Sequence, residues 1–160
     1  MTITIGDSIP TISLRTKTEN GIEEISTSDI FAGKKVVLFA LPGAFTPTCS
    51  AQHLPGYLAN VAAIKAKGVD TIACLSVNDA FVMDAWAKDQ NVGDAILMLA
   101  DGNSEFTAST DLGMDGSGFG LGYRSQRYSM LIEDGVVTKI NIEEPGQFEK
   151  SSAETILAQL

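Results

Sequence analysis

Two hydrophobic patterns alternate along the middle of this chain. Apolar runs within residues 34–41, 70–77 and 95–100 are typical of strands that are covered on both faces of a sheet. The segments 49–67 and 79–90, which lie between these runs, carry apolar residues at the spacing of a helix. Strands that alternate with helices predict parallel pairing through helical crossovers.

An antiparallel hairpin is predicted on each side of this region. The first covers residues 11–26, where a strand of alternating apolar and polar residues turns back at Glu19-Asn20-Gly21. The second covers residues 127–142 and turns at Asp134-Gly135.

Shorter segments complete the predicted elements. One helical turn is expected at residues 27–31 and a short helix at residues 104–112. Ser151 and Glu154 have the spacing of a capping box, which predicts a closing helix up to the end of the chain. The glycine-rich segment 114–122 has no following helix and no Walker lysine, so we interpret it as a flexible connection rather than a phosphate loop.

The resulting order is hairpin, βαβαβα, hairpin, helix. It predicts a single α/β domain over residues 1–160, with a mixed central sheet flanked by helices and an N-terminal β-hairpin. An antiparallel hairpin after two parallel crossovers is the arrangement of a thioredoxin-like fold.

Composition then limits the classes of function. Eleven basic and twenty acidic side chains give a net charge of −9, which argues against a nucleic-acid partner. No apolar run reaches the roughly 18 residues of a membrane span, and the first residues do not resemble a signal peptide. Two cysteines outside any C-x-x-C pair favour a reducing, cytoplasmic setting. One histidine is too few for the usual zinc sites.

The candidate nucleophile is Cys49, which follows the strand at residues 34–41. Thr46 is a good N-cap residue and Pro47 is favoured at the first helical position, so Cys49 becomes the third residue of a helix. Free N–H groups and the helix dipole at such a position favour thiolate over thiol. A lone cysteine is more often a buried, inert residue, but this local context favours a nucleophile. Pro55 predicts a kink or break in the same helix.

These residues also carry a resemblance to a known family. Pro42, Thr46 and Cys49 match the pattern P-x-x-x-T/S-x-x-C of peroxiredoxins. The strings at residues 42–56, 74–82 and 120–129 are similar to those of the atypical type II (Prx5-like) subfamily in the AhpC/TSA superfamily.

The resemblance implies a thiol-specific peroxidase that serves antioxidant defence. In such an enzyme the Cys49 thiolate attacks a peroxide, hydrogen peroxide or an alkyl hydroperoxide, and becomes a sulfenic acid. The resemblance assigns Thr46 to direct its hydroxyl at the thiolate and the peroxide, Pro42 to shield the sulfenate, and Arg127 to hold the thiolate and a peroxide oxygen. The expected lining of the substrate pocket is Gly43, Phe45, Thr48 and His53.

Two further basic residues have alternative interpretations. Arg124 either pairs on the surface or supports Arg127. His53 lies one helical turn after Cys49, where a cysteine protease would use it as a base. We expect it at the mouth of the pocket instead, because Pro55 distorts the helix and no third, orienting residue is apparent.

The role of Cys74 stays open in the sequence. It lies in a predicted buried strand, which favours a packed apolar cysteine, but some relatives resolve the sulfenate with a cysteine at this place. Residues 143–160 contain no cysteine, which excludes a resolving cysteine there. The remaining routes are resolution by Cys74 after local unfolding, or reduction by an outside thiol such as glutathione with glutaredoxin, or thioredoxin. The resemblance also implies a homodimer through Phe45 and the loop at 118–122.

Overall fold

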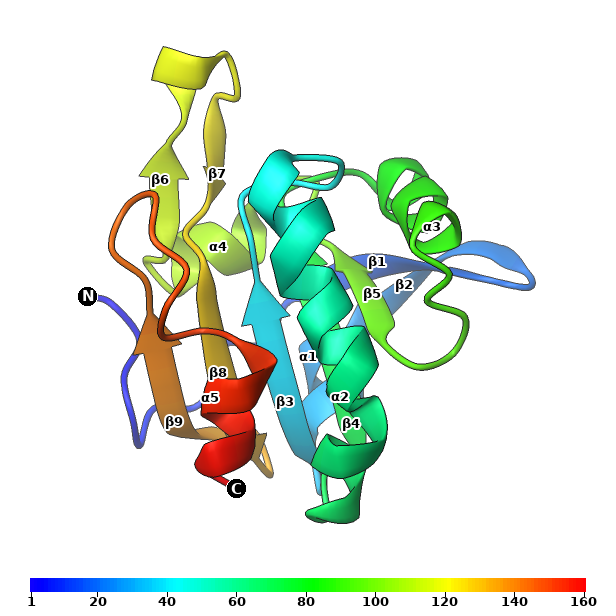
Figure 1. Ribbon diagram of the computed structural model, residues 1–160, viewed down its shortest axis with the longest axis vertical. Coiled ribbons are helices and arrows are strands. Elements are labelled where there is room, and N and C mark those ends of the chain that lie inside the picture. Colours follow the sequence, from blue (N-terminus) through cyan, green and yellow to red (C-terminus); the bar gives the residue numbers. More distant parts are fainter.

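A seven-stranded mixed sheet forms the centre of the computed structural model, which describes residues 1–160 (Figure 1). Its strand order is β2-β1-β5-β4-β3-β8-β9. The strands are β1 (Ser13–Thr18), β2 (Gly21–Ser26), β3 (Lys35–Ala40), β4 (Thr71–Ser76), β5 (Leu97–Ala100), β8 (Tyr128–Glu133) and β9 (Val136–Ile142). Strands β3, β4 and β5 pair in parallel and the other pairs are antiparallel, so the predicted mixed sheet and both hairpins are confirmed.

Helices cover both faces of the sheet. They are α1 (Thr27–Phe31), α2 (Leu54–Ala66), α3 (Ala80–Asp89), α4 (Glu105–Ser109) and α5 (Ala153–Ala158). Side chains of α2, α3 and α5 pack into one core cluster, and those of α1 and α4 pack into the other. Figure 1 shows α2 in front of β4 and α5 in front of β8, with the two helices side by side.

The central strands explain why their sequences are apolar throughout. Along β3, Val37 and Phe39 face the first cluster, whereas Val36, Leu38 and Ala40 face the second. All five are fully buried, because helices lie on both sides of this strand. The continuous apolar run therefore predicted the cover on both faces correctly.

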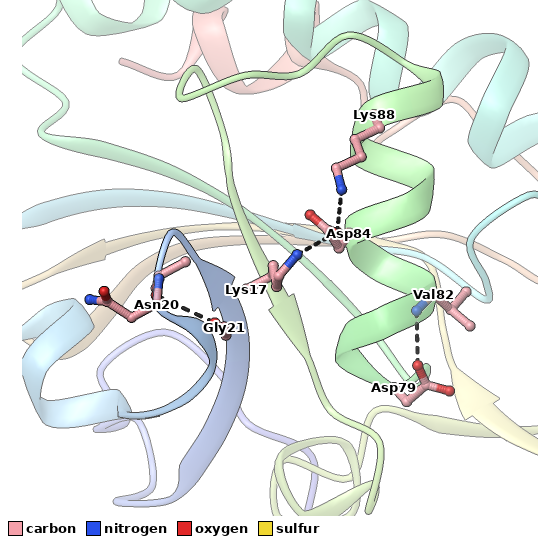
Figure 2. A network of polar contacts seen from close by, with 8 residues as sticks. Lys17, Asn20, Gly21, Asp79, Val82, Asp84 and Lys88 are labelled. Atoms are coloured by element: carbon pink, nitrogen blue, oxygen red, sulfur yellow. Dashed lines mark hydrogen bonds and ion pairs between the residues drawn. The ribbon is translucent and has the colours of Figure 1, made fainter.

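The N-terminal hairpin is joined to α3 by an ion-pair network. Figure 2 shows Asp84 of α3 between Lys17 of β1 and Lys88, at N···O distances of 3.1 and 3.0 Å. Hydrogen bonds from these two lysines lower the pKa of Asp84. The N-cap of α3 is Asp79, whose side chain accepts a hydrogen bond from the Val82 N–H at 2.8 Å.

The segment 114–122, predicted as a flexible connection, connects two short strands that the sequence analysis did not predict. The strands β6 (Gly113–Asp115) and β7 (Tyr123–Ser125) pair antiparallel around a 3-10 turn, η2 (Ser117–Phe119), and form a separate ribbon. A Cβ on Gly113 would collide with the Tyr123 ring, so glycine at this position lets the ring lie across the ribbon. In Figure 1 the ribbon extends beyond the end of the main sheet.

Two helix boundaries also differ from the prediction. Helix α4 ends at Ser109, which is earlier than expected, and Gly113 already belongs to a strand. Helix α5 is capped by Ser152 instead of Ser151, with the Ser152 hydroxyl accepting from the Thr155 N–H at 3.2 Å. The Ser151 side chain is used elsewhere, by Glu143.

None of the helices has the length and apolar character that crossing a bilayer requires.

Candidate active site

Cys49 lies where the end of β3 passes through a short loop into a helix. The helix begins at Pro47, and residues Cys49–His53 form a π-helical turn, η1, which continues directly into α2. The N–H groups of Thr48 and Cys49 donate to no protein acceptor. Both groups therefore remain available to negative charge beside the sulfur.

Thr46 has the predicted place but not the predicted contact. Its carbonyl accepts the Ser50 N–H at 3.0 Å, as expected for the residue before the helix. Its hydroxyl donates to the Gly43 carbonyl at 2.7 Å and does not cap the helix. The side chain thus fixes the loop between Gly43 and the helix, and leaves the first helical N–H groups free.

The π-helical turn replaces the kink that Pro55 predicts. A proline within an α-helix has no N–H to donate and crowds the preceding turn. Here the helix widens ahead of Pro55, and the Leu54 N–H bonds to the Cys49 carbonyl five residues back. The helix continues without a break, and both Cys49 and His53 are fully buried.

Arg127 reaches both of these side chains. Its Nη2 donates to the Cys49 sulfur at 3.2 Å, and its Nη1 lies 2.9 Å from His53 Nδ1. The sheet explains the approach, because Tyr128 of β8 lies opposite Ala40 of β3. Arg127, one residue earlier, therefore stands at the end of β3 from which the Cys49 loop departs.

His53 does not lie at the mouth of a pocket, which corrects the sequence prediction. Its ring is fully buried, with Nε2 at 3.1 Å from the Ser151 carbonyl. Burial and the Arg127 cation lower the pKa of His53 to about 3. The ring of Phe148 covers His53 at a centroid distance of 4.9 Å and lies 5.8 Å from the Arg127 guanidinium carbon. His53 is therefore a neutral partner of the arginine.

Arg124 supports the loop instead of pairing on the surface. Register places it opposite Met114 in the glycine-rich ribbon. Its Nη1 donates to the Pro42 carbonyl at 3.3 Å and its Nε to the Leu121 carbonyl at 2.9 Å. It thus links the Pro42 backbone to the glycine-rich ribbon.

The remaining predicted pocket residues differ in exposure. Gly43 is buried, and a Cβ there would lie 2.9 Å from Arg124 Nη1. Pro42 and Thr48 are half-buried, whereas Phe45 is 54% exposed and has a positive φ of 62°. Phe45 therefore faces outward from a strained turn rather than into the protein.

Cys74 is fully buried on β4, opposite Phe39 of β3. It belongs to the same core cluster as Cys49, and both thiols are free. Burial and the neighbouring Cys49 raise the pKa of Cys74 well above its ordinary value. Since the thiolate is the nucleophilic form, Cys74 is poorly suited to attack in this conformation.

Three residues of the site were missed by sequence reasoning. Asn78 accepts the Ala44 N–H of the Cys49 loop at 3.0 Å through its side-chain oxygen. Glu143 and Ser151 lie behind His53, and the sequence connected neither of them with the site, since Ser151 was interpreted only as a helix cap. Only Asn78 gave a signal in the sequence, since a polar residue directly after a buried strand lies at the edge of the sheet where the loops meet.

The arrangement fits one kind of chemistry. A sulfur at a helix start, two free N–H groups and a fixed cation can attack an electrophile whose leaving group gains negative charge. No three His, Cys, Asp or Glu side chains lie close enough together to share a metal ion. A cavity of about 320 Å³ lies elsewhere, beside α3 and β5, and contains none of the candidate residues.

Comparisons with known proteins agree with this chemistry. Residues 4–157 match the family model described as Redoxin. The chain is 47% identical to Peroxiredoxin-2E, chloroplastic, of Arabidopsis thaliana, over 99% of this chain and 69% of that protein. It is 52% identical to Peroxiredoxin sll1621 of Synechocystis, over 86% of this chain and 76% of that protein. The crystal structure of reduced Prx3 from Vibrio vulnificus in complex with H2O2 superposes with a TM-score of 0.94, at 56% identity and 98% coverage of both chains. The predicted thioredoxin-like fold is thereby confirmed.

Proposed function

Since this chain belongs to the redoxin family and is a peroxiredoxin of the AhpC/TSA superfamily, a thiol peroxidase with an antioxidant role, we propose that Cys49 is its peroxidatic nucleophile and passes through a sulfenic acid. The observation that carries this proposal is the 3.2 Å contact between Arg127 and the Cys49 sulfur at the start of a helix.

The chemical step follows from this geometry. The Cys49 thiolate attacks the terminal oxygen of a hydroperoxide, the O–O bond breaks, and the leaving alkoxide or hydroxide takes a proton to become alcohol or water. Arg127 and the free N–H groups of Thr48 and Cys49 stabilise the charge that develops on the oxygens. In this mechanism Thr46 orients the loop through Gly43, and Pro42 shields the sulfenate.

Regeneration requires a second thiol, which we assign to an outside reductant. Glutathione with glutaredoxin, or thioredoxin, would condense with the sulfenic acid, release water and leave a mixed disulfide, which a further thiol reduces. Burial of Cys74 and its raised pKa support this route over an internal disulfide.

Intact mass spectrometry of the reduced protein tests this assignment. One equivalent of hydrogen peroxide is added without any thiol. We expect a product one oxygen heavier, also in a Cys74→Ser control, and no product in Cys49→Ser. A product two hydrogens lighter would assign Cys74 as the resolving cysteine. Unchanged mass within seconds would refute the role of Cys49.

A homodimer is part of the proposal. Exposed aromatic side chains support an interface at the active-site end, where Phe45 is 54% and Phe119 of the ribbon 84% exposed. Light scattering should give a dimer that Phe119→Ser weakens. Phe81→Ser, on α3 and 71% exposed in the wild type, is the matched control and should remain dimeric. A monomeric wild type would contradict this part.

We also propose a reducing, cytoplasmic location, because both cysteines are free thiols. Fractionation of the producing cells with an antibody against the protein tests it, and recovery from an oxidising compartment would contradict it.

A further inference from the structure

Arg127 is the first member of a chain of contacts that continues away from Cys49. The outer part is residues 143–152, which we name the C-terminal strap, between β9 and α5. The strap begins next to Arg127, since the Glu143 N–H donates to the Arg127 carbonyl at 3.0 Å. The main chain of the two residues is therefore directly connected.

The side chain of Glu143 shapes the strap. Its Oε2 accepts the N–H groups of Glu149, Lys150 and Ser151 at 2.8–2.9 Å, and the Ser151 hydroxyl at 2.7 Å. Burial would raise the pKa of Glu143, but these four donors hold it below its ordinary value. The side chain is an ionised, buried anchor that determines where Ser151 stands.

The carbonyl of Ser151 points back toward the active site. It accepts the Tyr57 hydroxyl at 3.0 Å and lies 3.1 Å from His53 Nε2. A carbonyl can only accept a hydrogen bond, so the proton of the neutral imidazole must be on Nε2. His53 Nδ1 then carries a lone pair.

This lone pair faces the arginine. Arg127 Nη1 lies 2.9 Å from His53 Nδ1, and a guanidinium can only donate. The donor and acceptor roles are thus determined at both ends of the imidazole. With Nη1 held by His53, the other arm of the guanidinium is directed at the Cys49 sulfur.

We propose that Glu143 is a positioning residue for peroxide reduction, which holds the Ser151 carbonyl so that His53 keeps one tautomer and aims Arg127 at Cys49. The inference rests on the proposed function of Cys49 and Arg127. It adds a residue that touches neither the sulfur nor the peroxide. Glu143 stays buried although its Oε1 atom meets no donor group of the protein, because its other oxygen accepts four hydrogen bonds.

The wild-type protein gives the first test, since His53 is its only histidine. A long-range 1H–15N spectrum of the histidine-labelled protein reports its tautomer without assignment. We expect the Nε2–H form alone, unchanged between about pH 5 and pH 8. Arg127 and Tyr57 lie against His53, Cys49 shares Arg127 with it, and the Glu143 charge acts on it through Ser151. Burial and the Arg127 cation keep the ring neutral over this range. The Nδ1–H form, a mixture, or titration in this range would overturn the proposal.

Variants of Glu143 give the second test. Glu143→Ala removes the acceptor of all four hydrogen bonds that shape the strap. We expect the Arg127 guanidinium to move away from the Cys49 sulfur, and kcat/KM for hydrogen peroxide to fall tenfold to a hundredfold. The pH profile of Cys49 alkylation by iodoacetamide should move to higher pH. Glu143→Gln keeps one acceptor oxygen and can turn its amide nitrogen to the unpartnered side, so it should restore the rate to within about threefold of wild type. Glu144→Ala, at the exposed neighbouring residue, is the matched control and should change neither readout.

A double variant separates positioning from a general structural role. In an Arg127→Ala background, Glu143→Ala should cause no further shift of the alkylation profile. An equal additional shift in that background would overturn the proposal. If the alanine variant does not fold, the wild-type tautomer decides. Alkylation needs no peroxide, so a failure of the peroxidase function would appear separately, as a wild-type protein that consumes none.

Discussion

Arg127 donates to the sulfur of Cys49 across 3.2 Å, although the two residues are 78 positions apart in the chain. The antiparallel pairing of β3 with β8 creates this contact, since it brings the residue before Tyr128 to the end of β3. Cys49 and Arg127 therefore lie just beyond the ends of two neighbouring strands of one sheet, and their separation depends on the register of that sheet.

Replacement of Arg127 tests the value of this contact. Arg127→Ala should lower kcat/KM for hydrogen peroxide by about 10²–10³, the usual cost of losing one charged donor at a reacting centre. Stopped-flow peroxide consumption measures the rate, and circular dichroism checks folding. Arg15→Ala, which removes an exposed arginine from β1, should leave the rate unchanged. An unchanged rate in Arg127→Ala would refute the role of this arginine.

Asn78 is predicted to hold the Cys49 loop. Asn78→Ala leaves the buried Ala44 N–H without an acceptor, which should cost about 1–3 kcal/mol of stability and slow peroxide reduction several-fold. Asn78→Asp keeps an acceptor oxygen, so it should lose less stability and less activity than Asn78→Ala. Urea unfolding and steady-state kinetics provide the two measurements. Equal losses in both variants would show that the acceptor oxygen is not what matters.

Alanine should slow the reaction at Gly43 and raise the stability of the fold at Gly56. At Gly43 the new Cβ would lie 2.9 Å from Arg124 Nη1 and 3.2 Å from Thr46 Cγ2, so we expect Arg124 to leave the Pro42 carbonyl and the reaction to slow several-fold. Gly56 in α2 has nothing within 4 Å of such a Cβ. Gly56→Ala should raise the free energy of unfolding by about 0.5–1 kcal/mol without changing the rate. Thermal unfolding measures the stability and peroxide consumption measures the rate. A Gly43→Ala variant that reduces peroxide as fast as the wild type, or faster, would contradict the predicted displacement of Arg124.

His53 makes stability depend on pH. Its pKa is about 3 in the folded protein and 6.5 for the free side chain, so between these values the unfolded chain binds a proton that the native state does not. The free energy of unfolding should therefore fall as the pH falls below about 6.5, by up to roughly 1.4 kcal/mol per pH unit from this group.

A histidine-free variant isolates that contribution. Urea unfolding at several values between about pH 4.5 and pH 7 should give a shallower pH dependence for His53→Gln than for the wild type. Glu143 contributes at still lower pH. Hydrogen bonds lower its pKa in the native state, so the stability that its carboxylate contributes is lost only as the pH falls below the pKa of a free glutamate. Parallel curves for the two proteins in this range would contradict a neutral, buried His53.

Local patterns in the chain were sufficient for most of the fold. The apolar runs that became β3 and β4 predicted cover on both faces, and Asp134-Gly135 predicted the turn between β8 and β9. The glycine-rich ribbon was missed because its strands have three residues each, which is too short for a hydrophobic period to show.

The sequence by itself was sufficient to single out Cys49 as the candidate nucleophile, since the strand, Thr46, Pro47 and Cys49 are close along the chain and their effects are local. It also singled out Arg127 through the resemblance to a family. Only the tertiary structure decided how Cys49 and Arg127 are connected. The links through His53, Ser151 and Glu143 run between segments that are 74 to 98 residues apart, or through main-chain groups that have no signature in any sequence. Such contacts arise when the β8–β9 hairpin and the C-terminal strap pack beside α2, so they depend on long-range packing and not on local pattern.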